Sequence, residues 1–177
     1  MNQAEQDLLV LTAQSGNQQA FALLFKRYHK PLVSFAIKLS NDSELSNDAA
    51  QDAWITIAKN IRQLKDPRAF RSWIYRLVRW KLTDLLRKRS REGYQLKQLN
   101  EKITSNLVEN KRDDDETLSV ALSRLPSIEK QIIHLFYLDE MKIAEISLVL
   151  EIPAGTVKSR LSRARQMLKQ KYQQLEN

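Results

Sequence analysis

Apolar side chains recur at three- and four-residue steps along most of the 177-residue chain, and this spacing constrains the fold more than any other feature. Such spacing gathers apolar groups on one face of a helix. Only three glycines and four prolines are available to interrupt the pattern. The sequence therefore predicts an all-α fold. The clearest run contains Phe21, Leu24, Phe25, Tyr28, Leu32, Phe35, Ala36 and Leu39.

The helix boundaries are predicted from local signals. Pro31 lies inside the first run and is expected to kink that helix or to divide it in two. Ser46 and Asn47 are expected to cap the next helix. The pair Asp66-Pro67 predicts the start of a third helix, because a capping residue precedes a proline at the first helical position. We expect this third helix to end near Arg89.

The periodic pattern stops between residues 93 and 115, where the sequence is polar and too poor in large apolar residues to build a core. We expect this segment to be a flexible linker that ends in an acidic run starting at Asp113. It separates a domain of residues 1–92 from a domain of residues 116–177. Two small helical domains on a tether are the predicted organisation.

Several classes of chemistry are excluded by composition. The chain has no cysteine, so it has neither disulfides nor thiolate metal sites. Its three glycines are too far apart for a P-loop or a dinucleotide fingerprint. We expect no enzymatic activity, no metal site and no cofactor. No apolar run approaches the roughly 18 residues of a membrane span and no leader opens the chain, so we expect a cytoplasmic protein.

The net charge of +8 is concentrated in two blocks. Residues 62–91 contain 11 basic and 2 acidic side chains, and residues 153–172 contain 6 basic and no acidic ones. Solvated surfaces usually mix their signs, because exposed helices gain from oppositely charged pairs. Two segregated basic blocks indicate a polyanionic partner, most simply nucleic acid.

The second basic block lies on the last predicted helix, which follows a short helix (about 142–150) and a turn at residues 151–153. A short helix, a tight turn and a longer basic helix form a helix-turn-helix, whose second helix enters the DNA major groove. Apolar residues fall within about 60° of Val157 on a helical wheel, and the polar ones lie opposite. The opposite arc contains Lys158, Ser159, Ser162, Arg163, Gln166 and Lys169, and Arg160 and Arg165 flank the apolar stripe.

The first basic block lies on the helix that starts at Pro67, with Arg76, Arg79 and Arg87 opposite its apolar face. Trp73 and Trp80 lie at the edge between the two faces. Arginines that follow phosphates beside aromatic rings that stack on bases suit a surface that holds an opened strand. Tryptophan on a helix also packs in cores, so both roles remain open for these two rings.

The helix that contains Asp48, Gln51 and Asp52 differs from both basic blocks, because its exposed side is acidic and amidic. A catalytic carboxylate pair is one interpretation, but no histidine, metal-ligand cluster or glycine loop accompanies it. A surface that contacts another protein is the better interpretation.

These motifs, in this order, resemble the bacterial extracytoplasmic-function sigma factors, small two-domain initiation subunits of RNA polymerase. Asp48 to Trp54 (DAAQDAW) is similar to the family's segment that docks on the β′ clamp. Phe70 to Arg79 (FRSWIYRLVR), followed by Asp84 to Arg87, is similar to the segment that opens DNA and reads the minus-ten element. Leu125-Pro126, Tyr137-Leu138 and Ile152 to Arg165 (IPAGTVKSRLSRAR) are similar to the domain that reads the minus-thirty-five element.

The resemblance implies a sigma factor that binds core RNA polymerase at its β′ clamp and β flap and directs promoter-specific initiation. It also implies an anti-sigma partner, and the linker would follow the RNA exit path. The polymerase contacts would be Asp48, Gln51 and Asp52. The implied minus-thirty-five site contains Lys158, Ser159, Ser162 and Arg163, to which we add Arg160 and Gln166. The implied minus-ten site comprises Lys65, Arg68 and Phe70 from the base-capturing loop, with Trp73, Arg76, Arg79, Trp80 and Arg87 on the helix.

Two positions depart from the family pattern: Trp80 stands where asparagine is common, and Glu151 where glycine is frequent in the helix-turn-helix turn. An alternative function is a conventional helix-turn-helix regulator that acts without docking on core polymerase. That alternative accounts for the second basic block but not for the first, nor for the acidic helix.

Overall fold

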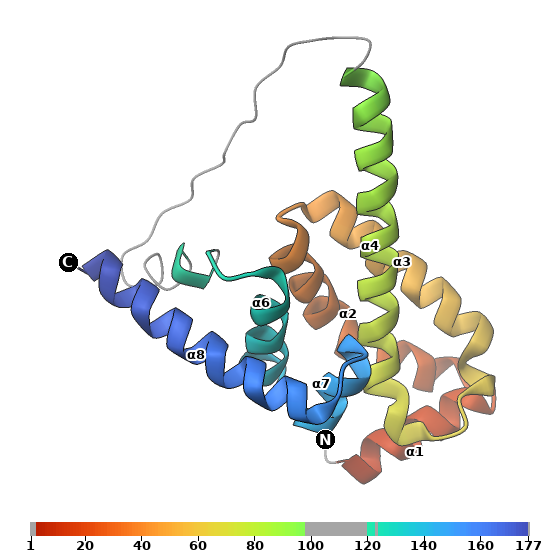
Figure 1. The fold of residues 1–177 in the computed structure, drawn as a ribbon. Helices are drawn as coiled ribbons and strands as arrows, with labels where there is room; N and C mark the ends of the chain where they lie inside the picture. Colours follow the sequence, from red (N-terminus) through yellow and green to blue (C-terminus); the bar gives the residue numbers. More distant parts are fainter. Residues whose placement is uncertain (1–2, 98–119, 123, 177) are drawn as a thin grey trace.

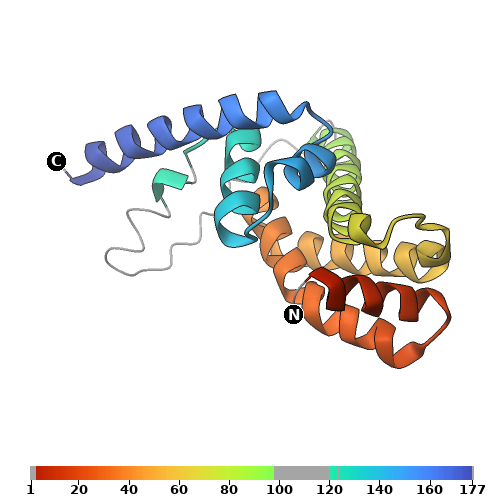
Figure 2. The ribbon, with the colours of Figure 1, turned by 90° about the horizontal axis from the view of Figure 1, so that it is seen from below.

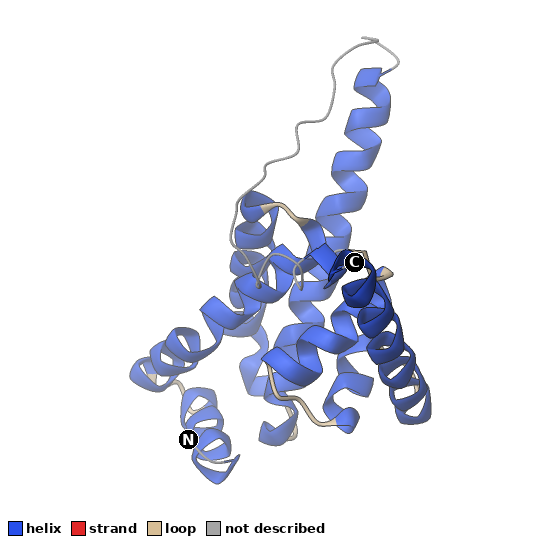
Figure 3. Ribbon diagram, turned by 90° about the vertical axis from the view of Figure 1, so that its left-hand side faces the viewer, coloured by secondary structure: helices blue, strands red, loops and turns tan. Residues whose placement is uncertain are grey.

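The computed structural model describes residues 3–97, 120–122 and 124–176. Every regular element in these ranges is helical, which confirms the predicted all-α class. Figure 3 shows the described helices and the loops between them. The predicted linker lies largely outside the described residues, and its acidic run at Asp113 to Glu116 lies wholly outside them.

The N-terminal helices form a bundle in which α2, α3 and α4 pack on one another and α1 covers α2 (Figures 1 and 2). Their apolar stripes meet in a core that includes Leu24, Phe35, Ile57 and Ile74, all fully buried. The bounds are α1 Gln3–Gln14, α2 Gln18–Ser40, α3 Ser43–Asn60 and α4 Phe70–Lys97, with short 3₁₀ turns η1 Ile61–Gln63 and η2 Pro67–Ala69 before α4.

Helix α2 continues through Pro31 as one element, so the expected division of this helix does not occur. Proline removes one backbone donor from the helix. Leu32, Phe35 and Ala36 immediately follow it and are completely buried. Their packing keeps the helix continuous, because burial of large apolar side chains outweighs the loss of one hydrogen bond.

Helix α3 begins one turn earlier than predicted, with Asp42 and not Ser46 or Asn47 as its cap. Asp42 has an extended backbone, and its Oδ1 accepts a hydrogen bond from the Leu45 N–H at 3.0 Å. The preceding Asn41 adopts the left-handed conformation that ends α2, so the chain turns at residues 41 and 42. Ser46 instead lies buried inside α3, with its hydroxyl donating to the backbone oxygen of Asp42 at 2.6 Å.

Helical structure starts at Asp66-Pro67 as predicted, since Asp66 accepts the Arg68 N–H at 3.0 Å and Pro67 is the first residue of the turn η2, but α4 itself begins three residues later, at Phe70. It ends later than predicted, at Lys97 and not near Arg89. The far end of α4 projects beyond the other helices in Figure 1. Residues 93–97 of the predicted linker are therefore helical.

The C-terminal helices are α6 Ser127–Ile133, the π-helical turn η3 His134–Leu138, α7 Ile143–Leu150 and α8 Ala154–Glu176. Helix α8 packs on α6 and α7, and these two in turn contact the N-terminal helices: α7 lies against α4, and α6 against α2. The ring of His134 in η3 lies 5.4 Å from that of Phe35 in α2. Buried residues of both groups consequently form one continuous core.

Candidate nucleic-acid and protein interfaces

The helix-turn-helix is formed by α7, the turn at residues 151–153, and α8. Glu151 ends α7 in the left-handed conformation, with φ of 58°. The Ser147 hydroxyl closes the turn by donating to the backbone oxygen of Ile152 at 2.6 Å. These contacts hold α8 across α6 and α7, which is the arrangement in which a second helix can enter the major groove.

Helix α8 places its apolar and polar residues as the periodicity predicts. Val157, Leu161 and Ala164 are buried against the preceding helices. The residues of the opposite arc are exposed, and they carry hydrogen-bond donors and small hydroxyls suited to base edges and phosphates. The exposed set is Lys158, Ser159, Ser162, Arg163 and Gln166.

Arg160 differs from its neighbours, because it forms an ion pair with a buried carboxylate. Its Nη1 lies 3.0 Å from Oε1 of Glu129 in α6, and Glu129 is only 3% exposed. The Arg160 side chain is 40% exposed. Arg160 therefore anchors α8 to α6, a role that the sequence did not indicate.

A second surface of the C-terminal helices is an apolar groove beside Arg165. The guanidinium of Arg165 lies over the rings of Phe136 and Tyr137, at 5.4 and 5.5 Å from their centroids. Its Nε donates to the Tyr137 hydroxyl at 2.7 Å. Tyr137 and Leu138 remain 51% and 64% exposed. The groove is lined by Ile133, Tyr137, Arg165, Leu168, Lys169, Tyr172 and Gln173.

The predicted minus-ten residues have several different environments. Lys65, Arg68 and Arg87 are exposed, and Trp73, Arg76 and Arg79 are half-buried. Trp80 is 44% exposed, and the Arg76 guanidinium lies over its ring at 5.2 Å. Arg68 pairs with Asp66 at 3.0 Å, which raises the pKa of Arg68 and lowers that of Asp66.

Phe70 requires a correction. Its side chain is fully buried, with its ring 5.6 Å from that of Tyr28 in α2. Phe70 is therefore a core residue of the N-terminal helices and does not face DNA in this structure. Phe70 is the first residue of α4, where the chain passes from a loop into the core. The large apolar side chain of Phe70 was the sequence feature that could have predicted its burial.

The C-terminal helices cover part of the α4 face that contains the first basic block. The Tyr75 hydroxyl donates to Oδ1 of Asp139 at 2.7 Å, and Nε of Arg79 donates to Oε1 of Gln131 at 2.9 Å. Burial, followed by the nearby Asp139 charge, raises the pKa of Tyr75 and keeps its phenol protonated as a donor. Neither Tyr75 nor Asp139 is among the site residues predicted from the sequence.

The acidic face of α3 is exposed as predicted. Asp48, Gln51 and Asp52 are three and four residues apart, so they share one side of the helix. Ile55 continues this side and is 47% exposed. The face therefore combines two carboxylates and an amide with one apolar side chain, a composition that suits contact with another protein.

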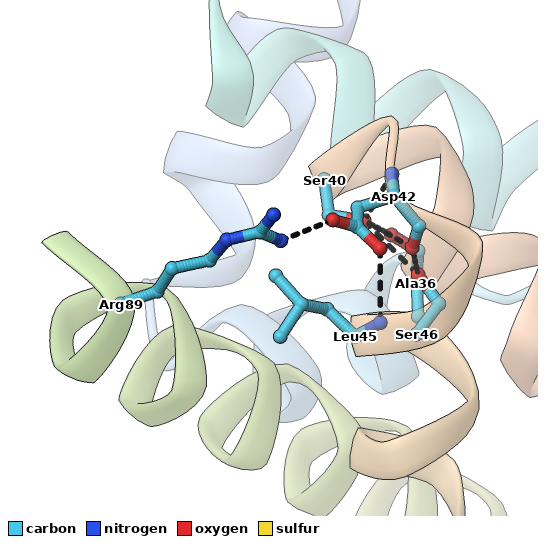
Figure 4. A network of polar contacts seen from close by, with 6 residues as sticks. All are labelled: Ala36, Ser40, Asp42, Leu45, Ser46 and Arg89. Atoms are coloured by element: carbon cyan, nitrogen blue, oxygen red, sulfur yellow. Dashed lines mark hydrogen bonds and ion pairs between the residues drawn. The ribbon is translucent and has the colours of Figure 1, made fainter. Parts of the chain in front are cut away.

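The α2–α3 turn is tied to α4 by a polar network (Figure 4). Arg89 of α4 donates to Oδ2 of Asp42, while Oδ1 of Asp42 caps α3. The Ser40 and Ser46 hydroxyls lie 3.0 Å apart behind this carboxylate. The Leu45 N–H, followed by the Arg89 guanidinium, lowers the pKa of Asp42. The network fixes the start of the acidic helix relative to the basic one.

Across the described ranges, no group of three or more histidine, aspartate or glutamate side chains is arranged to hold a metal ion. None of the described helices combines the length and apolarity that crossing a membrane requires.

Comparisons with known proteins agree on one family. Residues 24–92 match the family Sigma-70 region 2, and residues 115–168 match Sigma-70, region 4. The chain is 30% identical to the ECF RNA polymerase sigma factor SigW of Bacillus subtilis, over 90% of this chain and 92% of that protein. It is 29% identical to the ECF RNA polymerase sigma-E factor of Haemophilus influenzae, over 94% of this chain and 95% of that protein.

Two solved structures share the fold. CnrH, in complex with the cytosolic domain of CnrY, is 25% identical, with a TM-score of 0.68 over 93% of this chain and 94% of that one. The sigma factor RpoE of Bartonella quintana, in complex with the anti-sigma factor NepR, is 22% identical, with a TM-score of 0.70 over 86% of this chain and 96% of that one. Together with the two matched regions, these relatives show that the chain belongs to the ECF family of RNA polymerase sigma factors.

Proposed function

We propose that this sigma factor reads a promoter at two separated elements while it is bound to core RNA polymerase. The observation that carries the proposal is the exposed arc of α8, Lys158 to Gln166. This arc faces away from the core because the apolar residues on the opposite side of the helix are buried. We assign this arc to the minus-thirty-five element. Lys158 and Arg163 supply donors for guanine or phosphate oxygens, and Ser159, Ser162 and Gln166 are short or neutral enough to contact base edges.

We assign the minus-ten element to α4 and the turn before it. Lys65, Arg68 and Arg87 are exposed cations placed to contact backbone phosphates. Trp80 offers a half-exposed ring for stacking on an unpaired base, with Arg76 behind it. Trp73, Arg76 and Arg79 complete the proposed site, and Phe70 supports it from the core.

We assign the β′ clamp of core polymerase to the acidic face of α3, formed by Asp48, Gln51 and Asp52 together with Ile55. The face is exposed, and α3 itself contains no block of basic residues. The apolar groove beside Arg165 is the proposed contact for the β flap. Its exposed Tyr137, with the exposed Leu138 next to it in the chain, gives the apolar centre that protein interfaces use.

We further propose an anti-sigma partner. CnrH is seen with the cytosolic domain of CnrY, and the Bartonella RpoE with the anti-sigma factor NepR. The domain boundaries in this proposal are residues 1–92 and 116–177, separated by a linker of residues 93–115, with α4 continuing into the start of that linker. A tether lets polymerase fix the separation of the two DNA-reading surfaces, so that their affinities combine. The conventional regulator is not favoured, because the chain matches both sigma regions.

The proposal is tested by transcription from a randomised promoter library with core polymerase and this chain. We expect selected promoters to share two elements separated by a fixed spacing. Selection with the Arg163→Ala variant should relax the sequence preference of the minus-thirty-five element alone, because Arg163 is exposed on α8 and the minus-ten element is assigned to α4. If the variant relaxes the sequence preference at both elements equally, the separate assignment of α8 to the minus-thirty-five element and of α4 to the minus-ten element is wrong.

A further inference from the structure

The C-terminal helices lie on the α4 surface that the proposed function gives to minus-ten DNA. Four side chains of α4 have partners there: Arg71, Tyr75 and Arg79 at successive turns of the helix, and Trp80 next to Arg79. Arg71 lies 3.7 Å from Glu145 of α7, and its guanidinium also donates to the backbone oxygen of Asp139. The other three pairs are Tyr75–Asp139 at 2.7 Å, Arg79–Gln131 at 2.9 Å and Trp80–Glu151 at 2.9 Å. We call these four pairs the closed interface.

The hydrogen bonds and the ion pair of the closed interface all have the same direction. Every donor lies on α4, and every acceptor lies on the C-terminal helices or the turns that join them. The acceptors are three carboxylate residues and one amide oxygen. Phosphates of a DNA strand would offer α4 the same chemistry. The C-terminal helices thus occupy the positions in which a nucleic acid would satisfy Arg79 and Trp80.

The Trp80–Glu151 pair joins the two positions at which the sequence departs from the family pattern. Nε1 of Trp80 donates to Oε2 of Glu151 at 2.9 Å, although the residues are 71 positions apart. Glu151 adopts φ of 58°, a left-handed conformation that favours glycine over residues with a Cβ. A glutamate at this position is disfavoured by the backbone, and the hydrogen bond from Trp80 offsets part of that cost.

We propose that the free protein is held closed by this interface and that it must open before α4 can receive DNA. The inference rests on the proposed function, because it concerns regulation of the same α4 surface. Gln131 and Glu151 lie against Arg79 and Trp80, so a promoter strand cannot occupy the same surface while these contacts are made. Binding of the closed form to minus-ten DNA is therefore in competition with the C-terminal helices, and the apparent affinity falls with the closed fraction.

The chain itself supplies a variant and a matched control. Glu151→Gly removes the carboxylate from the closed interface and introduces the residue that the left-handed backbone prefers, so the turn stays folded. Glu140 is also a glutamate in the left-handed conformation, with φ of 49°, and it is exposed. Its side chain has no hydrogen bond or ion pair to any described residue. Glu140→Gly therefore makes the same change of charge and backbone at a residue whose own side chain is not part of the closed interface.

The test measures the distance between α3 and α8 in the full chain. The native sequence has no cysteine, so Lys59→Cys and Gln170→Cys create two exposed labelling sites for spin labels. Double electron–electron resonance on this background should give one narrow distance for the closed form. With Glu151→Gly we expect the ratio of closed to open molecules to fall about threefold to tenfold, the effect of losing one charge-assisted hydrogen bond. Glu140→Gly should leave the distribution unchanged.

Trp80→Phe changes the donor of the same pair. It removes the indole N–H and retains an aromatic ring for the contact with Arg76. It should open the protein as Glu151→Gly does. Identical distributions for the parent, both glycine variants and Trp80→Phe would overturn the closed interface. Equal opening by Glu140→Gly and Glu151→Gly would also overturn it, since backbone or charge alone would then explain the change.

Transcription assays on the same variants separate this inference from the proposed function. Promoter-specific transcription with unchanged distances in every variant overturns the closed interface alone. A parent chain that is closed, and opens with Glu151→Gly, but directs no promoter-specific initiation with core polymerase overturns the proposed function alone. We expect an active parent chain that Glu151→Gly opens.

Discussion

Oε1 of Glu129 lies 3.0 Å from Nη1 of Arg160, and this pair joins α6 to the helix that we assign to the minus-thirty-five element. Glu129 is 3% exposed, so its carboxylate depends on Arg160 for a charged partner. Arg160 was expected among the DNA contacts because it flanks the exposed arc. Its position indicates that it orients α8 and with it the neighbouring residues that we propose as DNA contacts.

Arg160→Ala should destabilise the protein by roughly 1–3 kcal/mol. Removing one partner of a buried ion pair leaves an uncompensated charge, although the 40% exposure of Arg160 reduces this cost through solvent screening. Urea unfolding monitored by circular dichroism measures the change. Arg163→Ala is the matched control, because Arg163 is exposed on the same helix, and it should stay within about 0.5 kcal/mol of the parent. Equal stability of the two variants would contradict the anchoring role.

The Arg163 side chain should contribute to recognition of one promoter element. If it contacts a base, Arg163→Ala should weaken binding of the holoenzyme to its preferred minus-thirty-five sequence by about 1–3 kcal/mol. Fluorescence anisotropy with matched and mutated promoter fragments measures this difference. A loss of affinity that is equal on all sequences would instead assign Arg163 to a phosphate.

Charge reversal on α3 should block docking on polymerase. Asp52→Arg places a cation in the acidic face formed by Asp48, Gln51 and Asp52, and we expect core polymerase binding to be lost while the helical circular dichroism signal is retained. Ser43→Arg introduces the same side chain at an exposed position about 180° away from Asp52 on the same helix, and it should bind normally. Unchanged affinity of the Asp52→Arg variant would refute the assignment of this face.

The Asp42 carboxylate should make stability dependent on acid pH. Its pKa is lower in the folded protein than the usual 3.8, chiefly through the Leu45 N–H and then Arg89. The stabilisation is therefore complete above pH 3.8 and is lost as the pH falls through the folded pKa. Asp42→Asn keeps the capping oxygen but does not titrate. Unfolding free energies at pH values on either side of 3.8 should fall less steeply for Asp42→Asn, and parallel pH profiles would exclude Asp42 as the titrating group.

The features that the sequence predicted correctly are local ones. The apolar stripe of α8 at Val157, Leu161 and Ala164 and the exposed arc opposite follow from 3.6-residue periodicity. The start of helical structure before α4 follows from Asp66-Pro67, whose capping geometry needs only adjacent residues. The cap of α3 was misplaced because aspartate, serine and asparagine are comparable caps. The choice of Asp42 depends on the left-handed Asn41 before it and on Arg89, 47 residues away.

The contacts between the N-terminal and C-terminal helices could not be predicted from sequence patterns. Tyr75 and Asp139 are 64 positions apart, and the motif that contains Tyr75 does not indicate Asp139 as its partner. Phe70 illustrates the same limit within one domain. Its position in a motif suggested a DNA contact, while its packing against Tyr28 depends on how α2 and α4 meet. Such pairings are set by the packing of whole helices.

Binding to core RNA polymerase tests the account most directly. Purified chain and core enzyme, mixed without DNA, should co-elute from a size-exclusion column in equal stoichiometry, and the Asp52→Arg variant should elute separately. Elution of the folded parent chain apart from core enzyme would contradict the proposed docking through α3.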